Sequence, residues 1–165
     1  MSSTPHIELP RGRLIEVRFD SASIARHPNP DIEQERQVAI HDLIDCNSFE
    51  LVDGSSGPYR LILGHVNTRL VFDVRNEHGE PLTTHTLSVA PLRRIVRDYF
   101  LLCESYYDAV KSAPSSRIEA LDISRRGLHD EGSHKVVERL AEKIKVDHNT
   151  GRQLFTLICA LHWKG

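Results

Sequence analysis

The chain has 165 residues, the length of one domain, and its 39% hydrophobic and 27% charged residues exclude a disordered chain and a membrane-embedded one. The formal net charge is −2, made up of −5 over residues 1–89 and +3 over residues 90–165. This polarity is well short of the clustered basic footprint of nucleic-acid-binding proteins, so a nucleic-acid partner is not expected. No apolar run approaches the ~18 residues needed to span a bilayer, so no membrane partner is expected either.

The chain is predicted to begin with a flexible lead-in over residues 1–12, followed by a single α+β domain over residues 13–165. Alternating hydrophobicity predicts a first strand over Arg13–Phe19. Its apolar side is formed by Ile15, Val17 and Phe19.

A helix is predicted next, with Asn29 as its N-cap and Pro30 at its first position, ending near Cys46 and Asn47. Its apolar face consists of Ile32, Ala39, Ile40, Leu43 and Ile44. The side chains expected to face water are Glu33, Glu35, Arg36 and Asp42.

A β-rich block follows, with a short extended segment at Phe49–Val52 and a returning strand at Leu82–Val89. Between them, Tyr59–Val66 and Arg69–Arg75 flank a tight two-residue turn. That turn fixes the register, which places Leu61, Leu63 and His65 beside Val74, Phe72 and Leu70 on one face of a half-buried sheet.

A long helix is predicted from Pro91 to about Lys111, and its apolar stripe is unusually wide. Such a helix is either deeply buried or part of a subunit contact. Phe100, Leu101 and Tyr107 widen the stripe and are therefore the candidate interface residues.

Three further helices are expected in the remainder of the chain. A capping box at Ser116 starts one that Gly127 stops, and Ser133 caps the next, whose core face extends to Ile144. The last begins at Asp147 or Thr150. The expected order is β-α-β-β-β-β-α-α-α-α, an α+β fold with a single antiparallel sheet of about five strands packed by helices.

The three cysteines, Cys46, Cys103 and Cys159, are odd in number and widely spaced. They are interpreted as buried thiols of a cytoplasmic protein rather than as a disulfide framework. No nucleophile elbow, phosphate-binding loop, dinucleotide turn or zinc-protease helix occurs in the sequence, so no catalytic residue is assigned and a non-enzyme is favoured over an enzyme.

Several runs along the chain resemble those of uncharacterised protein family 0262, a bacterial group. They are Gly57–Leu61, Arg93–Phe100, Cys103–Tyr107, Ser115–Ala120, Arg125–Gly127 and Leu154–Leu157. The runs follow one order from about Asp31 onward, and the resemblance implies a small cytosolic bacterial protein without supplying an activity. In one departure, Ala90 stands where family members have Thr or Ser, and Ala is a poor N-cap for the long helix.

The ten histidines do not predict a metal site or a cofactor. His129 and His134 are five residues apart across Gly132 and cannot share a helical face, and His162 with Cys159 is a single pair. His65 and His85 are turned toward the apolar side of the sheet, where a histidine is usually neutral and bonded to backbone.

The least expected feature is a group of arginines in the first two turns of the long helix, where the helix dipole disfavours positive charge. A second basic group surrounds Gly127. The anion-binding candidates are Arg93, Arg94, Arg97, Arg125, Arg126 and His129. Intramolecular ion pairs with the acidic first half are the alternative explanation for these arginines.

Two functions stay open, and the first is a non-enzymatic binding or regulatory module that acts through protein–protein contact or self-association. The alternative is a binder of, or enzyme on, a phosphorylated or carboxylated small molecule held by the arginines. RNA binding by the basic second half is a further alternative.

Overall fold

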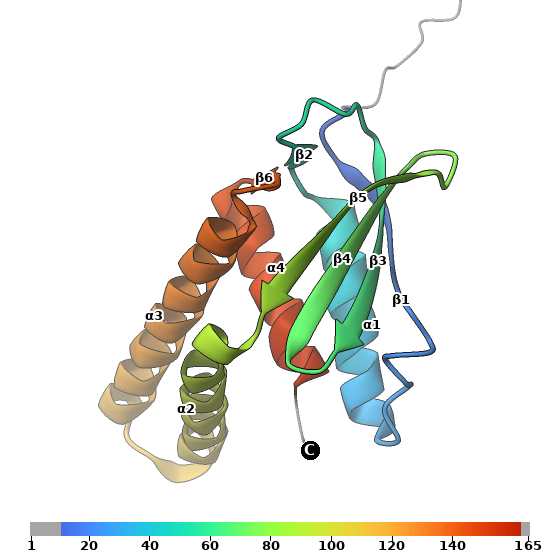
Figure 1. The fold of residues 1–165 in the computed structure, drawn as a ribbon. Helices are drawn as coiled ribbons and strands as arrows, with labels where there is room; N and C mark the ends of the chain where they lie inside the picture. The colour runs from blue at the N-terminus through green and yellow to red at the C-terminus, as the bar shows by residue number, and fades with distance from the viewer. Residues whose placement is uncertain (1–10, 163–165) are drawn as a thin grey trace, which may run out of the picture.

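A computed structural model describes residues 11–162, so the predicted lead-in lies almost entirely outside the described residues. The α+β class is confirmed (Figure 1). The elements in chain order are β1 (Leu14–Phe19), α1 (Pro30–Asp45), β2 (Phe49–Leu51), β3 (Tyr59–Val66), β4 (Arg69–Asn76), β5 (Pro81–Ser88), the 3₁₀ turn η1 (Ala90–Leu92), α2 (Arg93–Ser112), α3 (Ser115–Leu140), β6 (Ile144–Val146) and α4 (His148–Leu161). Over residues 11–162, no helix is long and apolar enough to cross a bilayer.

The prediction of a single antiparallel sheet is wrong. The main sheet has four strands in the order β1-β3-β4-β5 and is mixed, because β1 runs parallel to β3 while the other neighbours are antiparallel. Helix α1 lies between β1 and β3 in the chain and returns it to the end from which β1 started, as a parallel pair requires. Strands β2 and β6 form a separate antiparallel pair.

The register of the central hairpin is confirmed, with Leu61 opposite Val74 and Leu63 opposite Phe72. Asn67 in the turn has φ of 57°, the left-handed conformation that a two-residue hairpin needs. The buried side chains of this face join one hydrophobic cluster with those of α1 and α4, and Figure 1 shows these two helices behind the sheet.

The predicted inward residues of β1 are partly wrong. Leu14 and Val17 are buried, whereas Ile15 is only partly buried. Leu14 and Val17 are three residues apart, whereas inward side chains of a regular strand are two apart. The difference arises because a bulge shifts the register between Leu14 and Glu16.

Helix α1 begins as predicted, since the Asn29 side chain accepts a hydrogen bond from the Asp31 amide at 2.9 Å. Glu33 and Arg36 were expected to face water but are buried. The Arg36 guanidinium donates to the carbonyls of Ala160 and Leu161 at the end of α4, where free carbonyls favour a cation. Glu33 pairs with Arg36 at 3.6 Å.

The predicted break at Gly127 is wrong, because α3 continues through Gly127 and Ser133 to Leu140. Ser133 donates to the His129 carbonyl one turn earlier instead of capping a new helix. Ile144 belongs to β6 rather than to a helix. The three helices predicted after the long helix are therefore two, separated by a short strand.

Helices α3 and α4 approach each other very closely at Gly132. A β-carbon at this position would overlap the ring of Phe155, a side chain with no exposed surface. Gly151 on α4 is similarly close to Val137 and to the Ser133 carbonyl. Two glycines, one on each helix, thus allow the pair to pack at short range.

Helix α2 starts after η1 with no side-chain cap, in agreement with the poor N-cap at Ala90. Helices α2 and α3 form a hairpin that extends away from the sheet (Figure 1). The cysteines carry no disulfide within the described residues, and Cys103 and Cys159 are buried as expected. Cys46 is exposed, contrary to expectation, because it caps the surface end of α1.

Candidate functional site

A pocket of about 960 Å³ lies between the β3–β4 turn, the start of α2 and the end of α4. We call it the basic pocket. Its lining residues are His65, Asn67, Thr68, Val89, Ala90, Arg93, Arg94, Val96, Arg97, Phe100, Leu101, Glu104 and His162. Three of the six predicted anion-binding residues therefore line one cavity, together with an apolar wall.

The arginines of the basic pocket differ in how their charge is balanced. Arg94 reaches across to Glu131 of α3 at 3.7 Å, and Arg97 lies 3.6 Å from its neighbour Asp98. Among residues 11–162, no carboxylate oxygen lies within 4 Å of the Arg93 guanidinium. Arg93 also stands in the first turn of α2, where the helix dipole adds positive potential.

Two histidines, His65 and His162, also line the basic pocket. The Nδ1 atom of His162 donates to the Ile158 carbonyl at 2.7 Å, which leaves Nε2 as a hydrogen-bond acceptor. Burial lowers the pKa of His162, and the nearby His65 and Arg93 act in the same direction. His162 is therefore neutral near pH 7, and the positive charge of the pocket comes from its arginines.

The second basic group does not join the first. Arg125 lines a smaller cavity of about 430 Å³, with Cys103 and Tyr107, and its guanidinium stacks 4.1 Å from the Tyr106 ring centre. Arg125 and Arg126 both bind Asp122, at 2.6 and 3.1 Å, and the Arg125 hydrogen bond lowers the pKa of that carboxyl. Ion pairing thus accounts for these two arginines. The expectation that the acidic first half would supply the partners is wrong, because Asp122, like the partners of Arg94 and Arg97, lies in the second half of the chain.

His129 is a packed residue of the α3–α4 contact. Its Nε2 donates to the Thr156 hydroxyl at 2.8 Å, since that hydroxyl itself donates to the Arg152 carbonyl. Its ring also contacts the rings of Tyr99 and Phe155. Burial, reinforced by the charge of Arg152, lowers the pKa of His129 to about 4. His129 is neutral at pH 7 and lies away from the basic pocket.

The candidate interface residues lie around the two cavities. Leu101 is 55% exposed at the wall of the basic pocket, and Tyr107 is 59% exposed beside the Arg125 cavity. Phe100 lies between them and lines both. The wide apolar stripe of α2 is therefore partly buried and partly exposed.

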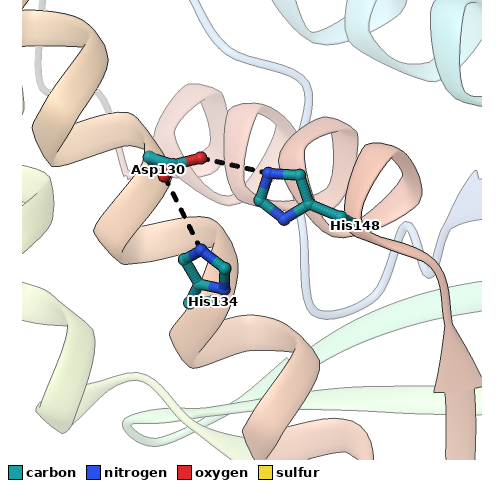
Figure 2. Close-up of side chains that lie close together, drawn as sticks. All are labelled: Asp130, His134 and His148. Atoms are coloured by element: carbon teal, nitrogen blue, oxygen red, sulfur yellow. Dashed lines mark hydrogen bonds and ion pairs between the residues drawn. The ribbon is translucent and has the colours of Figure 1, made fainter.

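A further polar group was not found from the sequence. Asp130 and His134 of α3 meet His148 of α4, and the three ligand-type atoms lie within 4.8 Å of one another. Figure 2 shows one carboxylate oxygen of Asp130 directed at each imidazole. We call this group the Asp-His-His cluster. The only sequence signal was the i, i+4 spacing of Asp130 and His134, because His148 arrives from another helix.

The comparisons with known proteins agree on one family. The model of the Uncharacterised protein family (UPF0262) matches residues 11–164. The UPF0262 protein of Brucella anthropi is 55% identical over 158 residues, covering 95% of this chain and 98% of the relative. The UPF0262 protein of Azorhizobium caulinodans is 53% identical over 167 residues, covering all of both chains. No solved structure matches.

Proposed function

We propose that this chain, which belongs to the Uncharacterised protein family (UPF0262), binds a small organic phosphate or carboxylate in the basic pocket. The proposal is of a binding protein and includes no chemical step. We also place the protein in the cytoplasm, which the unpaired thiols of Cys46, Cys103 and Cys159 favour.

The observation that carries the proposal is the Arg93 guanidinium, which lines a cavity large enough for a metabolite and has no carboxylate partner among residues 11–162. Arg93 and Arg97 can each offer a planar fork of donors to an anionic group. Val89, Val96 and Leu101 offer an apolar wall to the remainder of the ligand. The supported ligand class is therefore an anion with an apolar body rather than inorganic phosphate alone.

Arg93→Ala should weaken binding of this ligand by about 10- to 100-fold, because a hydrogen bond to a charged group contributes about 1.5–3 kcal/mol. The measurement is thermal unfolding against a panel of organic phosphates, nucleotides, carboxylates and short RNAs at two salt concentrations. A ligand at about 100 times its Kd stabilises the fold by about 2.7 kcal/mol, a shift of several degrees.

Arg126→Ala is the matched control, because Arg126 is likewise an exposed arginine and lies outside the basic pocket. A saturable shift lost in Arg93→Ala and kept in Arg126→Ala supports the proposal. No shift with any compound, or equal loss in both variants, contradicts it. A shift with RNA alone that falls steeply with salt would favour the RNA alternative.

A second candidate function is protein contact or self-association through the α2–α3 hairpin. The specific observation is its exposed apolar side chains, with Tyr107 and Val110 on α2 and Ile123 on α3 all more than half exposed. Exposed apolar groups gathered on one projecting element are typical of contact surfaces.

If this hairpin self-associates, the protein should elute as a species larger than 18.8 kDa, and Tyr107→Asp should return it to the monomer. The reason is that a buried carboxylate at such a contact would lose its hydration. Sedimentation velocity over a concentration series measures the change. Val52→Asp, at an equally exposed valine of the β2 region, should leave the assembly intact. A wild-type monomer at high concentration rules out self-association.

A further inference from the structure

We propose that the Asp-His-His cluster, formed by Asp130, His134 and His148, binds a divalent transition-metal ion, with zinc as the first candidate, and thereby links α3 to α4. This inference is independent of the basic pocket. It also departs from the expectation, drawn from the sequence, that the histidines form no metal site.

The spacing of the donor atoms fits a small metal ion. Nε2 of His148 lies 3.0 Å from Oδ1 of Asp130, and Nε2 of His134 lies 3.6 Å from Oδ2. A tetrahedral zinc ion with bonds of about 2.0–2.1 Å sets neighbouring ligand atoms about 3.3 Å apart. The two observed distances run to different oxygens of Asp130, and one ligand atom from each of the three residues lies within 4.8 Å of the others. Side-chain rotations that shorten these separations would form the site (Figure 2).

The backbone holds these side chains in place. Asp130 and His134 are four residues apart on one face of α3, and His148 is the first residue of α4. Close packing of α3 on α4 at Gly132 and Gly151 fixes the distance between the two helices. The backbone positions of the three ligands are therefore fixed relative to one another, and rotation of their side chains would complete the site.

The donor set selects the class of metal. Two imidazoles and one carboxylate suit zinc and its first-row neighbours, whereas calcium and magnesium prefer oxygen ligands alone. All three side chains are about half exposed or more, so water can complete the coordination. His129 does not belong to this group, because the ligand atoms that lie within 4.8 Å of one another come from Asp130, His134 and His148 alone among the described residues.

One neighbouring charge opposes a cation and provides a sharp test. The guanidinium of Arg152 lies 3.6 Å from the same Asp130 oxygen that binds His148. Zinc would have to displace this arginine from the carboxylate. Removing the charge in Arg152→Gln should therefore tighten zinc binding, an effect that a simple surface ion-pair network would not produce.

The experiment is titration calorimetry of the full chain with zinc chloride alone, in a buffer without chelators. We expect one zinc per chain, with Kd raised about tenfold or more by His134→Ala and by His148→Ala, and lowered severalfold by Arg152→Gln. Circular dichroism confirms that each variant is folded. His41→Ala, at an exposed histidine of α1, is the matched control and should bind as the wild type does.

Absence of saturable binding by the wild type overturns the proposal. It is also overturned if His41→Ala weakens binding as much as the two cluster variants do, because the metal would then be held by scattered surface histidines. A thermal-unfolding series gives a second readout, in which zinc should raise the Tm of the wild type and fail to do so for His148→Ala.

Discussion

Gly132→Ala is expected to destabilise the protein by about 2–3 kcal/mol, the upper part of the range for overpacked cores. The added methyl group would enter the ring of Phe155, and a carbon at this position would lie 2.6 Å from its Cδ2. Phe155 is fully buried and cannot turn aside without disturbing the contact between α3 and α4. Urea denaturation at pH 7 measures the loss as a lower transition midpoint.

Gly127→Ala is the matched substitution on the same helix. A β-carbon there meets nothing within 4 Å, and alanine is the better helix former by about 0.5–1 kcal/mol. This variant should be as stable as the wild type or more so. Equal destabilisation by the two substitutions would contradict the continuous helix and the close helix contact together.

The stability of the fold should fall as the pH is lowered from about 6.5 to about 4, with His129 as a principal cause. Its pKa is about 4 in the folded protein because of burial, against 6.5 for an exposed histidine. Between these values the unfolded chain binds a proton that the folded chain does not, so acid favours unfolding. At about 1.4 kcal/mol for each unit of pKa, the loss can reach about 2–3 kcal/mol.

His129→Gln should flatten this dependence, since glutamine does not titrate. Unfolding free energies from urea titrations at pH 4.5 and 7 provide the comparison. His78→Gln, at an exposed histidine, should keep the wild-type dependence. The pKa of His162 is also lowered, so the unfolding free energy of His129→Gln should still fall as the pH is lowered, but less steeply than that of the wild type. An unchanged pH dependence of the unfolding free energy in His129→Gln would show that this ring is not the partly buried, neutral group described above.

Features governed by neighbouring residues could be predicted from the sequence. The β3–β4 register follows from a two-residue turn and a period of two, and the cap at Asn29 follows from a side chain that accepts a nearby amide. Asp147, one of the two residues considered for the start of the last helix, is the cap of α4. The predicted capping box at Ser116 is wrong, because α3 begins directly after Pro114 with no side-chain cap. The helix break predicted at Gly127 does not occur, because glycine weakens a helix by only about 1 kcal/mol, which packing along α3 outweighs.

Features governed by distant contacts could not be predicted. The parallel pairing of β1 and the burial of Arg36 depend on β3 and on the end of α4, which are remote in the chain. The separation of the two arginine groups also depends on helix packing, because the arginines of α2 line the basic pocket whereas Arg125 of α3 lines a different cavity. His148 joins Asp130 only because α4 packs on α3.

The place of α4 in the fold has a consequence for synthesis of the protein. Leu154, Phe155, Leu157 and Ile158 are all but fully buried, and α4 packs against both α1 and α3. Yet α4 follows every other described element in the chain, so it is the last of them to leave the ribosome. Until then the nascent polypeptide exposes the apolar surfaces that α4 will cover, and chaperones and proteases compete for them. A message truncated before His148 would yield a polypeptide destined for degradation rather than a smaller working protein.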